Sequence, residues 1–174
     1  MKLFLIVLAS LLLLGCTSTN PTETAYHVHS DFKVYLNNQA FDFSLEKYQT
    51  PYVCGDEHKE SNIHLHGGNG EVVHVHDEPA TWKEFFESLG GQLSSTCFIM
   101  DSETSCGDLR FFVNGEEVFN LPEREINDLD KVLITLNASQ EELSAQLNSI
   151  TNFACIESRK CDVPEGYVLD KCST

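Results

Sequence analysis

Apolar and polar residues alternate along much of this chain, a pattern typical of β-strands that bury one face. Between such segments, Asn37-Asn38 and Asn114-Gly115 tolerate the positive φ angles that two-residue hairpin turns require. We therefore expect a protein built largely of hairpins. The predicted strands span residues 26–36, 40–44, 62–66, 71–76, 96–100, 109–113, 116–120 and 131–136.

Helical spacing replaces this alternation in two places. Thr81 and Glu84 stand three residues apart, as in a capping box, and an apolar stripe follows until Gly90. Ser139 and Glu142 repeat the capping pattern before a second amphipathic segment. The stripe of the first helix is expected to pack in the core rather than to line a ligand pocket. Its members are Trp82, Phe85, Phe86 and Leu89.

The stretch 109–116, followed by 126–134, resembles the second half of β-grasp domains of the ubiquitin and sulfur-carrier type. Such domains run hairpin, helix and further strands, and residues 62–136 follow that order. The resemblance implies a β-grasp-like mixed sheet with one packed core helix. With the N-terminal hairpin, the C-terminal helix and a disulfide-rich tail expected from the residues themselves, the predicted fold class is α+β. The expected segments are 1–15 (signal peptide), 16–25 (lipidated tether), 26–136 (His-rich α+β domain) and 137–174 (C-terminal helix and Cys-rich tail).

Six of the seven histidines occur in His-x-His pairs within predicted strands. Residues i and i+2 of a strand point to the same face, about 7 Å apart, so the two imidazoles of a pair can close on one metal ion. Imidazole nitrogen suits Cu(II), Zn(II) or Ni(II) rather than Ca(II) or Mg(II). The predicted ligands of a copper or zinc ion are His64, His66, His74, His76, His27 and His29.

The register of the hairpin 62–76 decides whether its histidines meet. A three-residue loop, Gly68-Asn69-Gly70 with Gly70 in the left-handed bulge position, pairs His64 with His74 and puts both pairs on one face. A two-residue Asn69-Gly70 turn puts them on opposite faces, because a one-residue slip flips every side chain. We favour the bulged turn. His27, His29 and Asp31 share a face of another strand, and they either complete this site or form a second one.

The N-terminus predicts export. Lys2 precedes a 12-residue apolar run, and residues 13–16 (Leu-Leu-Gly-Cys) resemble a lipobox, the lipidation motif of prokaryotic lipoproteins. Lipidation at Cys16 would anchor the protein to the outer face of the cell membrane. An ordinary secretory signal cut nearby is the alternative.

The remaining cysteines are even in number, which in an exported domain implies disulfides. Cys97 and Cys106 flank a polar turn, and we expect them to pair. Of the three tail cysteines, Cys155, Cys161 and Cys172, we expect one to pair with Cys54 and the other two with each other. No Cys-x-x-Cys occurs, which disfavours thioredoxin-type redox chemistry.

The formal net charge is −16. Such a field repels nucleic acid and attracts cations, so the expected partners are a metal ion and, through the lipid, the membrane. The sequence names no protein partner. His58 stands alone in a charged loop and is expected at the surface.

Most of the chain after residue 26 resembles a family of exported archaeal proteins, some labelled protein-disulfide isomerase. The resemblance rests on His-x-His-x-Asp-Phe at 27–32, on the two His pairs at 64–76, and on Asn-Ser-Ile-Thr-x-x-Ala-Cys-Ile-x-Ser-x-Lys-Cys at 148–161.

Three function classes follow. The favoured one is a cell-surface lipoprotein that captures or delivers copper or zinc. The second is a metal-dependent enzyme with an open His site, for which Asp31, Asp77 and Glu78 are candidate bases. The third is a thiol-disulfide exchange protein, in line with the label of the similar family.

Overall fold

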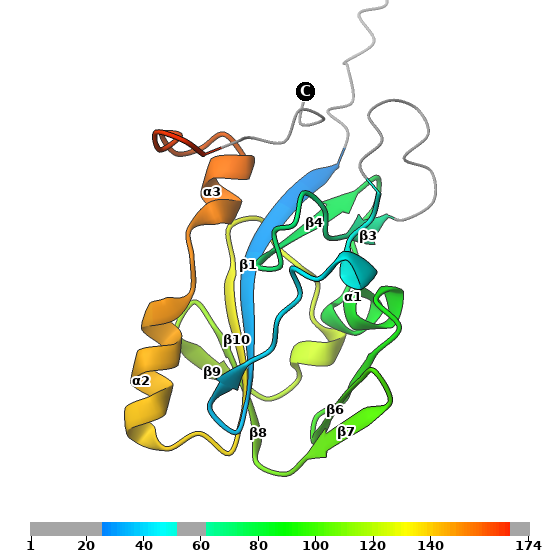
Figure 1. The fold of residues 1–174 in the computed structure, drawn as a ribbon, viewed down its shortest axis with the longest axis vertical. Helices are drawn as coiled ribbons and strands as arrows, with labels where there is room; N and C mark the ends of the chain where they lie inside the picture. Colours follow the sequence, from blue (N-terminus) through cyan, green and yellow to red (C-terminus); the bar gives the residue numbers. More distant parts are fainter. Residues whose placement is uncertain (1–25, 52–61, 168–174) are drawn as a thin grey trace, which may run out of the picture.

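A mixed β-sheet forms the centre of the computed structural model, which describes residues 26–51 and 62–167 (Figure 1). The expected signal peptide, Cys16, Cys54, His58 and Cys172 lie outside the described residues. The strand order is β3-β4-β1-β10-β8-β9, and β2 pairs with β1. The bounds are β1 His27–Leu36, β2 Gln39–Ala40, β3 Ile63–His64, β4 Val72–His76, β8 Leu109–Val113, β9 Glu116–Val118 and β10 Lys131–Leu136.

The central strands β1 and β10 run parallel, from the pair Asp31–Lys131 to the pair Leu36–Leu136. Strand β4 lies antiparallel to β1, and β8 lies antiparallel to β10. The expected α+β fold with a β-grasp-like sheet is therefore confirmed. The β-grasp order was assigned to residues 62–136, but its central strand beside β10 is β1, which precedes that range.

One face of the sheet is covered by helix α1 (Trp82–Ser88), which begins with the predicted capping box. The Thr81 side chain accepts from the backbone N–H of Glu84, while the Glu84 carboxylate accepts from the backbone N–H of Thr81. The buried aromatic residues of α1 pack against Phe32 of β1, and the Phe32 and Phe85 ring centroids are 5.0 Å apart. The stripe that begins at Trp82 is thus core, as predicted.

A smaller sheet of three short strands follows α1. It consists of β5 (Gln92–Leu93), β6 (Cys97–Met100) and β7 (Glu103–Cys106). Cys97 and Cys106 occupy directly paired positions of β6 and β7, which confirms the expected hairpin. Other expectations were less accurate: neither β5 nor β7 was predicted as a strand, and the strands predicted at 40–44 and 62–66 are the two-residue β2 and β3.

The opposite face of the main sheet carries α2 and α3. Helix α2 (Gln140–Ser149) begins with the predicted Ser139–Glu142 capping box and buries Leu143 against Leu133 of β10. Helix α3 (Phe153–Glu157) was not predicted, and it contacts β1 and β4. The 3-10 turns are η1 (Glu46–Tyr48) and η3 (Leu121–Glu123). Among the described residues, no helix is long and apolar enough to cross a membrane.

Candidate metal centre

Three neighbouring strands bring the six paired histidines together. In the register of β1 and β4, His27 lies opposite His76 and His29 lies opposite His74. In the register of β3 and β4, His64 lies opposite His74, as the sequence predicted. Because residues two apart share a face of a strand, these side chains lie on one face of the sheet. His66 follows β3, and its ring centroid is 3.9 Å from that of His74.

The tightest group of possible ligand atoms comes from His27, His74 and His76. One ring nitrogen from each of them lies within 4.8 Å of the others. The rings of His27 and His76 are stacked, with centroids 4.1 Å apart. His27 and His76 are half-buried, whereas His74 is 2 % exposed. The group therefore has a buried inner member and two outer members.

His74 is the centre of the cluster. Its ring centroid lies 4.5 Å from that of His29 and 5.8 Å from that of His64, and its Nδ1 forms a 3.2 Å hydrogen bond with Nε2 of His66. Burial, followed by charge repulsion from the surrounding histidines, holds the pKa of His74 well below its usual value. A neutral imidazole is the form that ligates a metal, so this environment favours the binding-competent state.

The connection between the two His pairs differs from the predicted bulged turn. It runs from residue 65 to 71, and the positive φ angles fall at Gly67 (69°) and Gly68 (74°) rather than at Gly70. Gly70 is required for another reason: a Cβ there would lie 2.4 Å from the backbone nitrogen of Ser44. The prediction of the turn type was wrong, although the register that it was meant to explain is right.

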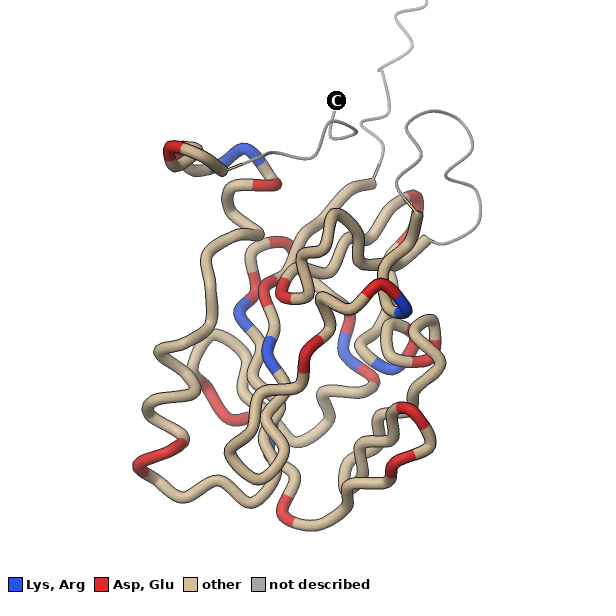
Figure 2. Tube along the Cα trace, viewed as in Figure 1, with Lys and Arg blue, Asp and Glu red and all other residues tan. Residues whose placement is uncertain are grey.

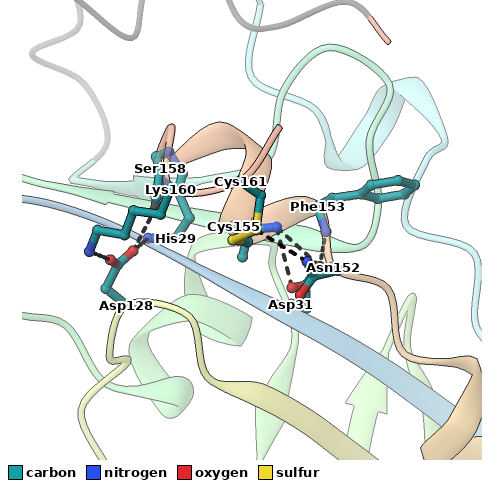
Figure 3. Close-up of a disulfide and its surroundings, with 10 residues drawn as sticks. His29, Asp31, Asp128, Asn152, Phe153, Cys155, Ser158, Lys160 and Cys161 are labelled. Carbon is teal, nitrogen blue, oxygen red and sulfur yellow. Dashed lines mark hydrogen bonds and ion pairs between the residues drawn. A yellow bond between two sulfur atoms is a disulfide. The ribbon is translucent and has the colours of Figure 1, made fainter. Parts of the chain in front are cut away.

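Asp31 shares the histidine face of β1, but its carboxylate is engaged by the segment that leads into α3 (Figure 3). Its Oδ1 accepts from Thr151 Oγ1 at 2.7 Å and from the backbone N–H of Phe153 at 2.9 Å. The backbone N–H of Ala154 also donates to it. Burial raises the pKa of Asp31 although these hydrogen bonds act to lower it. The structure thus gives Asp31 a clear role as the anchor of α3.

A second anchor joins His29 to the end of α3. Ser158 Oγ lies 2.8 Å from His29 Nδ1 and donates a 2.7 Å hydrogen bond to Oδ1 of Asp128. Lys160 forms an ion pair with the other carboxylate oxygen of Asp128. Burial raises the pKa of Asp128, but the hydrogen bonds from Lys160, from the His29 amide and from Ser158 outweigh it, so the pKa lies below its ordinary value.

Sequence reasoning did not select Asp128, Ser158 or Lys160 as site residues. A signal was nevertheless present, because Ser158 and Lys160 belong to the motif at 148–161, which folds onto the first His-x-His motif. The candidate bases Asp77 and Glu78 follow β4 directly and are exposed. Nothing among the described residues aims them into the cluster.

Two disulfides are formed within the described part of the chain, and one of them borders the site. The Cys97–Cys106 bridge was predicted. The Cys155–Cys161 bridge closes the segment that carries Ser158 and Lys160, and it joins two of the three tail cysteines, as expected (Figure 3). The third tail cysteine, Cys172, and Cys54 lie outside the described residues.

Acidic residues are spread along much of the described chain, whereas Lys and Arg are few (Figure 2). The whole chain has 27 acidic and 11 basic residues. The resulting field raises the local concentration of cations around the protein.

No family model, curated protein or solved structure matches this chain. Its own geometry therefore has to define the class of site. A group of six imidazoles on one face of the sheet, four of them buried, is a candidate metal centre. The described cysteines are in disulfides and so do not offer thiolate ligands.

Proposed function

We propose that this protein binds a transition metal ion, Cu(II) or Zn(II), through His27, His74 and His76. The observation that carries the proposal is the approach of their ring nitrogens to within 4.8 Å of one another. Nitrogens that bind one zinc ion at 2.0–2.1 Å in tetrahedral geometry lie about 3.3 Å apart. Closing the remaining gap of about 1.5 Å is within reach of small side-chain rotations, because His27 and His76 are half-buried.

The chemistry of the donors supports a late first-row metal. Neutral imidazoles form strong bonds to copper and zinc, whereas calcium and magnesium prefer oxygen ligands. His74 is held neutral by burial and by its histidine neighbours. Three further imidazoles, those of His29, His64 and His66, lie in ring contact with this group and would act as additional ligands or as supports.

The proposed setting is the outer face of the cell membrane, to which a lipid on Cys16 anchors the protein. The lipobox at residues 13–16 supports this placement, and so do the disulfides Cys97–Cys106 and Cys155–Cys161, because disulfides persist in oxidising compartments. There the protein captures a metal ion or passes it to an acceptor.

The test measures metal on the full-length protein, extracted in detergent and purified without a metal-affinity step. We expect bound copper or zinc by elemental analysis, and saturable binding of each added ion by calorimetry. The double variant His27→Ala/His76→Ala should lose most of this binding. A matched double variant, Gln92→Ala/Glu116→Ala, removes two exposed strand residues elsewhere and should bind normally. Unchanged affinity in the histidine variant would defeat the assignment.

One observation favours a second function, thiol-disulfide exchange: Cys155 and Cys161 form a bridge that is only half-buried and thus open to attack by a thiolate. This function predicts that the purified protein catalyses reduction of a disulfide substrate by a dithiol. It also predicts that Cys155→Ser/Cys161→Ser abolishes the exchange activity, whereas metal binding is weakened but not lost.

A further inference from the structure

Besides the three closest ligand atoms, one histidine of the cluster is held by an ordered chain of hydrogen bonds. His29 lies at the end of this chain, Ser158 in the middle and Asp128 at the other end (Figure 3). The backbone of His29 is held by the same loop: its N–H donates to Asp128 Oδ1 at 3.0 Å, and its carbonyl accepts from the N–H of Leu129 at 2.7 Å. Both the backbone and the ring of His29 are therefore fixed.

The hydrogen bonds that connect His29, Ser158 and Asp128 can be donated in one direction only. Asp128 receives hydrogen bonds from Lys160, from the His29 backbone and from Ser158, and an ionised carboxylate only accepts. The hydroxyl of Ser158 has a single proton, which it donates to Asp128. Its oxygen must then accept from Nδ1 of His29. Nδ1 of His29 carries the ring proton, and in a neutral imidazole this leaves Nε2 with the lone pair.

We propose that Asp128 and Ser158 are positioning residues that fix His29 as the Nδ1–H tautomer, so that its Nε2 serves as a further ligand of the proposed metal ion. This inference rests on the proposed function. The Nε2 atom of His29 is buried, and the ring centroid of His29 lies 4.4 Å from that of His27 and 4.5 Å from that of His74. A ligating Nε2 at this position would lie beside His27 and His74, two of the three closest ligands.

The arrangement is suited to metal binding and unsuited to nucleophilic catalysis. In a serine-histidine-carboxylate triad the histidine stands in the middle and removes the serine proton. Here the serine stands in the middle and gives its proton to the carboxylate, so its oxygen is not activated by His29. A hydrogen bond from the outer ring nitrogen of a ligating histidine to such a partner fixes the ring orientation and increases ligand basicity.

The experiment reads the tautomer directly. Ring nitrogens of isotope-labelled histidine are observed by NMR in the full-length, metal-free protein at pH 8, and then zinc chloride is added. In the wild type, His29 should carry its proton on Nδ1, and zinc should shift the Nε2 signal. In Ser158→Ala, the Nε2–H form of His29 should appear and zinc affinity should fall about tenfold to a hundredfold.

Ser149→Ala is the matched control, because Ser149 is also half-buried and its hydroxyl bonds a β1 side chain on the same face, the hydroxyl of Tyr35 at 2.9 Å. This variant should leave both the His29 tautomer and the zinc affinity unchanged. A merely structural role of Ser158 would alter stability without converting the tautomer.

The outcomes separate this inference from the proposed function. An Nε2–H tautomer of His29 in the wild-type protein would overturn the inference even if Ser158→Ala did not fold. Unchanged zinc affinity in a folded Ser158→Ala variant would overturn it as well. An Nδ1–H tautomer that depends on Ser158 in a protein that binds neither zinc nor copper would instead defeat the proposed function, and with it the ligand role of His29, while supporting the positioning role of Ser158.

Discussion

Nε2 of His66 lies 3.2 Å from Nδ1 of His74, which is a hydrogen-bond distance between two ring nitrogens. Such a bond needs a proton on one nitrogen and a lone pair on the other, so the two imidazoles cannot both be charged while they keep it. When Nδ1 of His74 is the donor, the Nε2 atom of the same ring keeps the lone pair that a metal ion needs. This single contact therefore affects both the charge of the cluster and the nitrogen through which His74 can bind a metal ion.

Acid should destabilise the metal-free protein. The pKa of His74 is lowered in the folded state by burial and by its histidine neighbours, so the unfolded chain binds a proton more readily. The stabilisation is fully present above the unfolded pKa of about 6.5 and is lost as pH falls below it. Each pH unit below that value should remove about 1.4 kcal/mol for this one proton.

Denaturant unfolding of metal-free protein between pH 8 and pH 5 measures this slope. A His74→Phe variant keeps a buried ring without a titrating group, so its stability should depend less on pH, whatever its stability at pH 8. A wild-type free energy of unfolding that stays constant over this range would contradict the buried, neutral state of His74.

Removing the hydrogen bond to His74 should weaken metal binding without abolishing it. In His66→Ala, His74 loses the partner of its Nδ1, and zinc affinity should fall about tenfold to a hundredfold, as is typical when a support of a ligating histidine is removed. Calorimetry with zinc chloride gives both affinity and stoichiometry. A decrease in the number of ions bound per chain would show that His66 is itself a ligand.

Replacing Asp31 should detach α3 from the sheet. Asp31→Ala removes the acceptor of the Phe153 and Ala154 backbone amides and of the Thr151 hydroxyl. These buried or partly buried donors then lose their hydrogen bonds to the carboxylate. We expect a loss of about 1–3 kcal/mol in the free energy of unfolding. Asp42→Ala is the control, because within the described residues the exposed Asp42 carboxylate bonds the nearby Ser44, and its loss should cost far less.

The sequence predicted those features that have a local cause. Alternation placed β1, β4, β8 and β10, and the Thr81 and Ser139 capping boxes placed the starts of α1 and α2. The pairing of His64 with His74 was also predicted correctly, although from a turn type that the structure does not have. These results account for how His64 and His74 could be placed together from the sequence, whereas the joining of His27 and His29 to the same cluster appears only in the pairing of β1 with β4.

Features with a distant cause could not be predicted in this way. The parallel pairing of β1 with β10 joins residues about one hundred positions apart, Asp31 and Lys131, and no local pattern records it. Helix α3 has five residues, too few for a helical period, and its start is fixed by Asp31 across more than a hundred residues. The approach of Gly70 to the Phe43–Ser44 backbone likewise exists only in the folded protein, which is why the turn type was misjudged.

Breaking the disulfide of the small sheet should lower stability and leave the metal centre intact. Cys97 and Cys106 are directly paired, with Cα atoms 4.1 Å apart and a sequence separation of 9. In the chain-entropy model, closing a loop of this length stabilises the folded state by about 2–3 kcal/mol, and Cys97→Ser/Cys106→Ser should lose that amount. The bridge lies at the end of the molecule opposite to α3 and β4 (Figure 1), so zinc affinity should not change. Denaturant unfolding and zinc calorimetry on the same variant test both statements.

The Cys155→Ser/Cys161→Ser variant supplies the contrast. The Cys155–Cys161 bridge closes the segment that carries Ser158, so its loss should lower zinc affinity as well as stability. Equal effects of the two variants on zinc affinity would contradict a link between α3 and the histidine cluster.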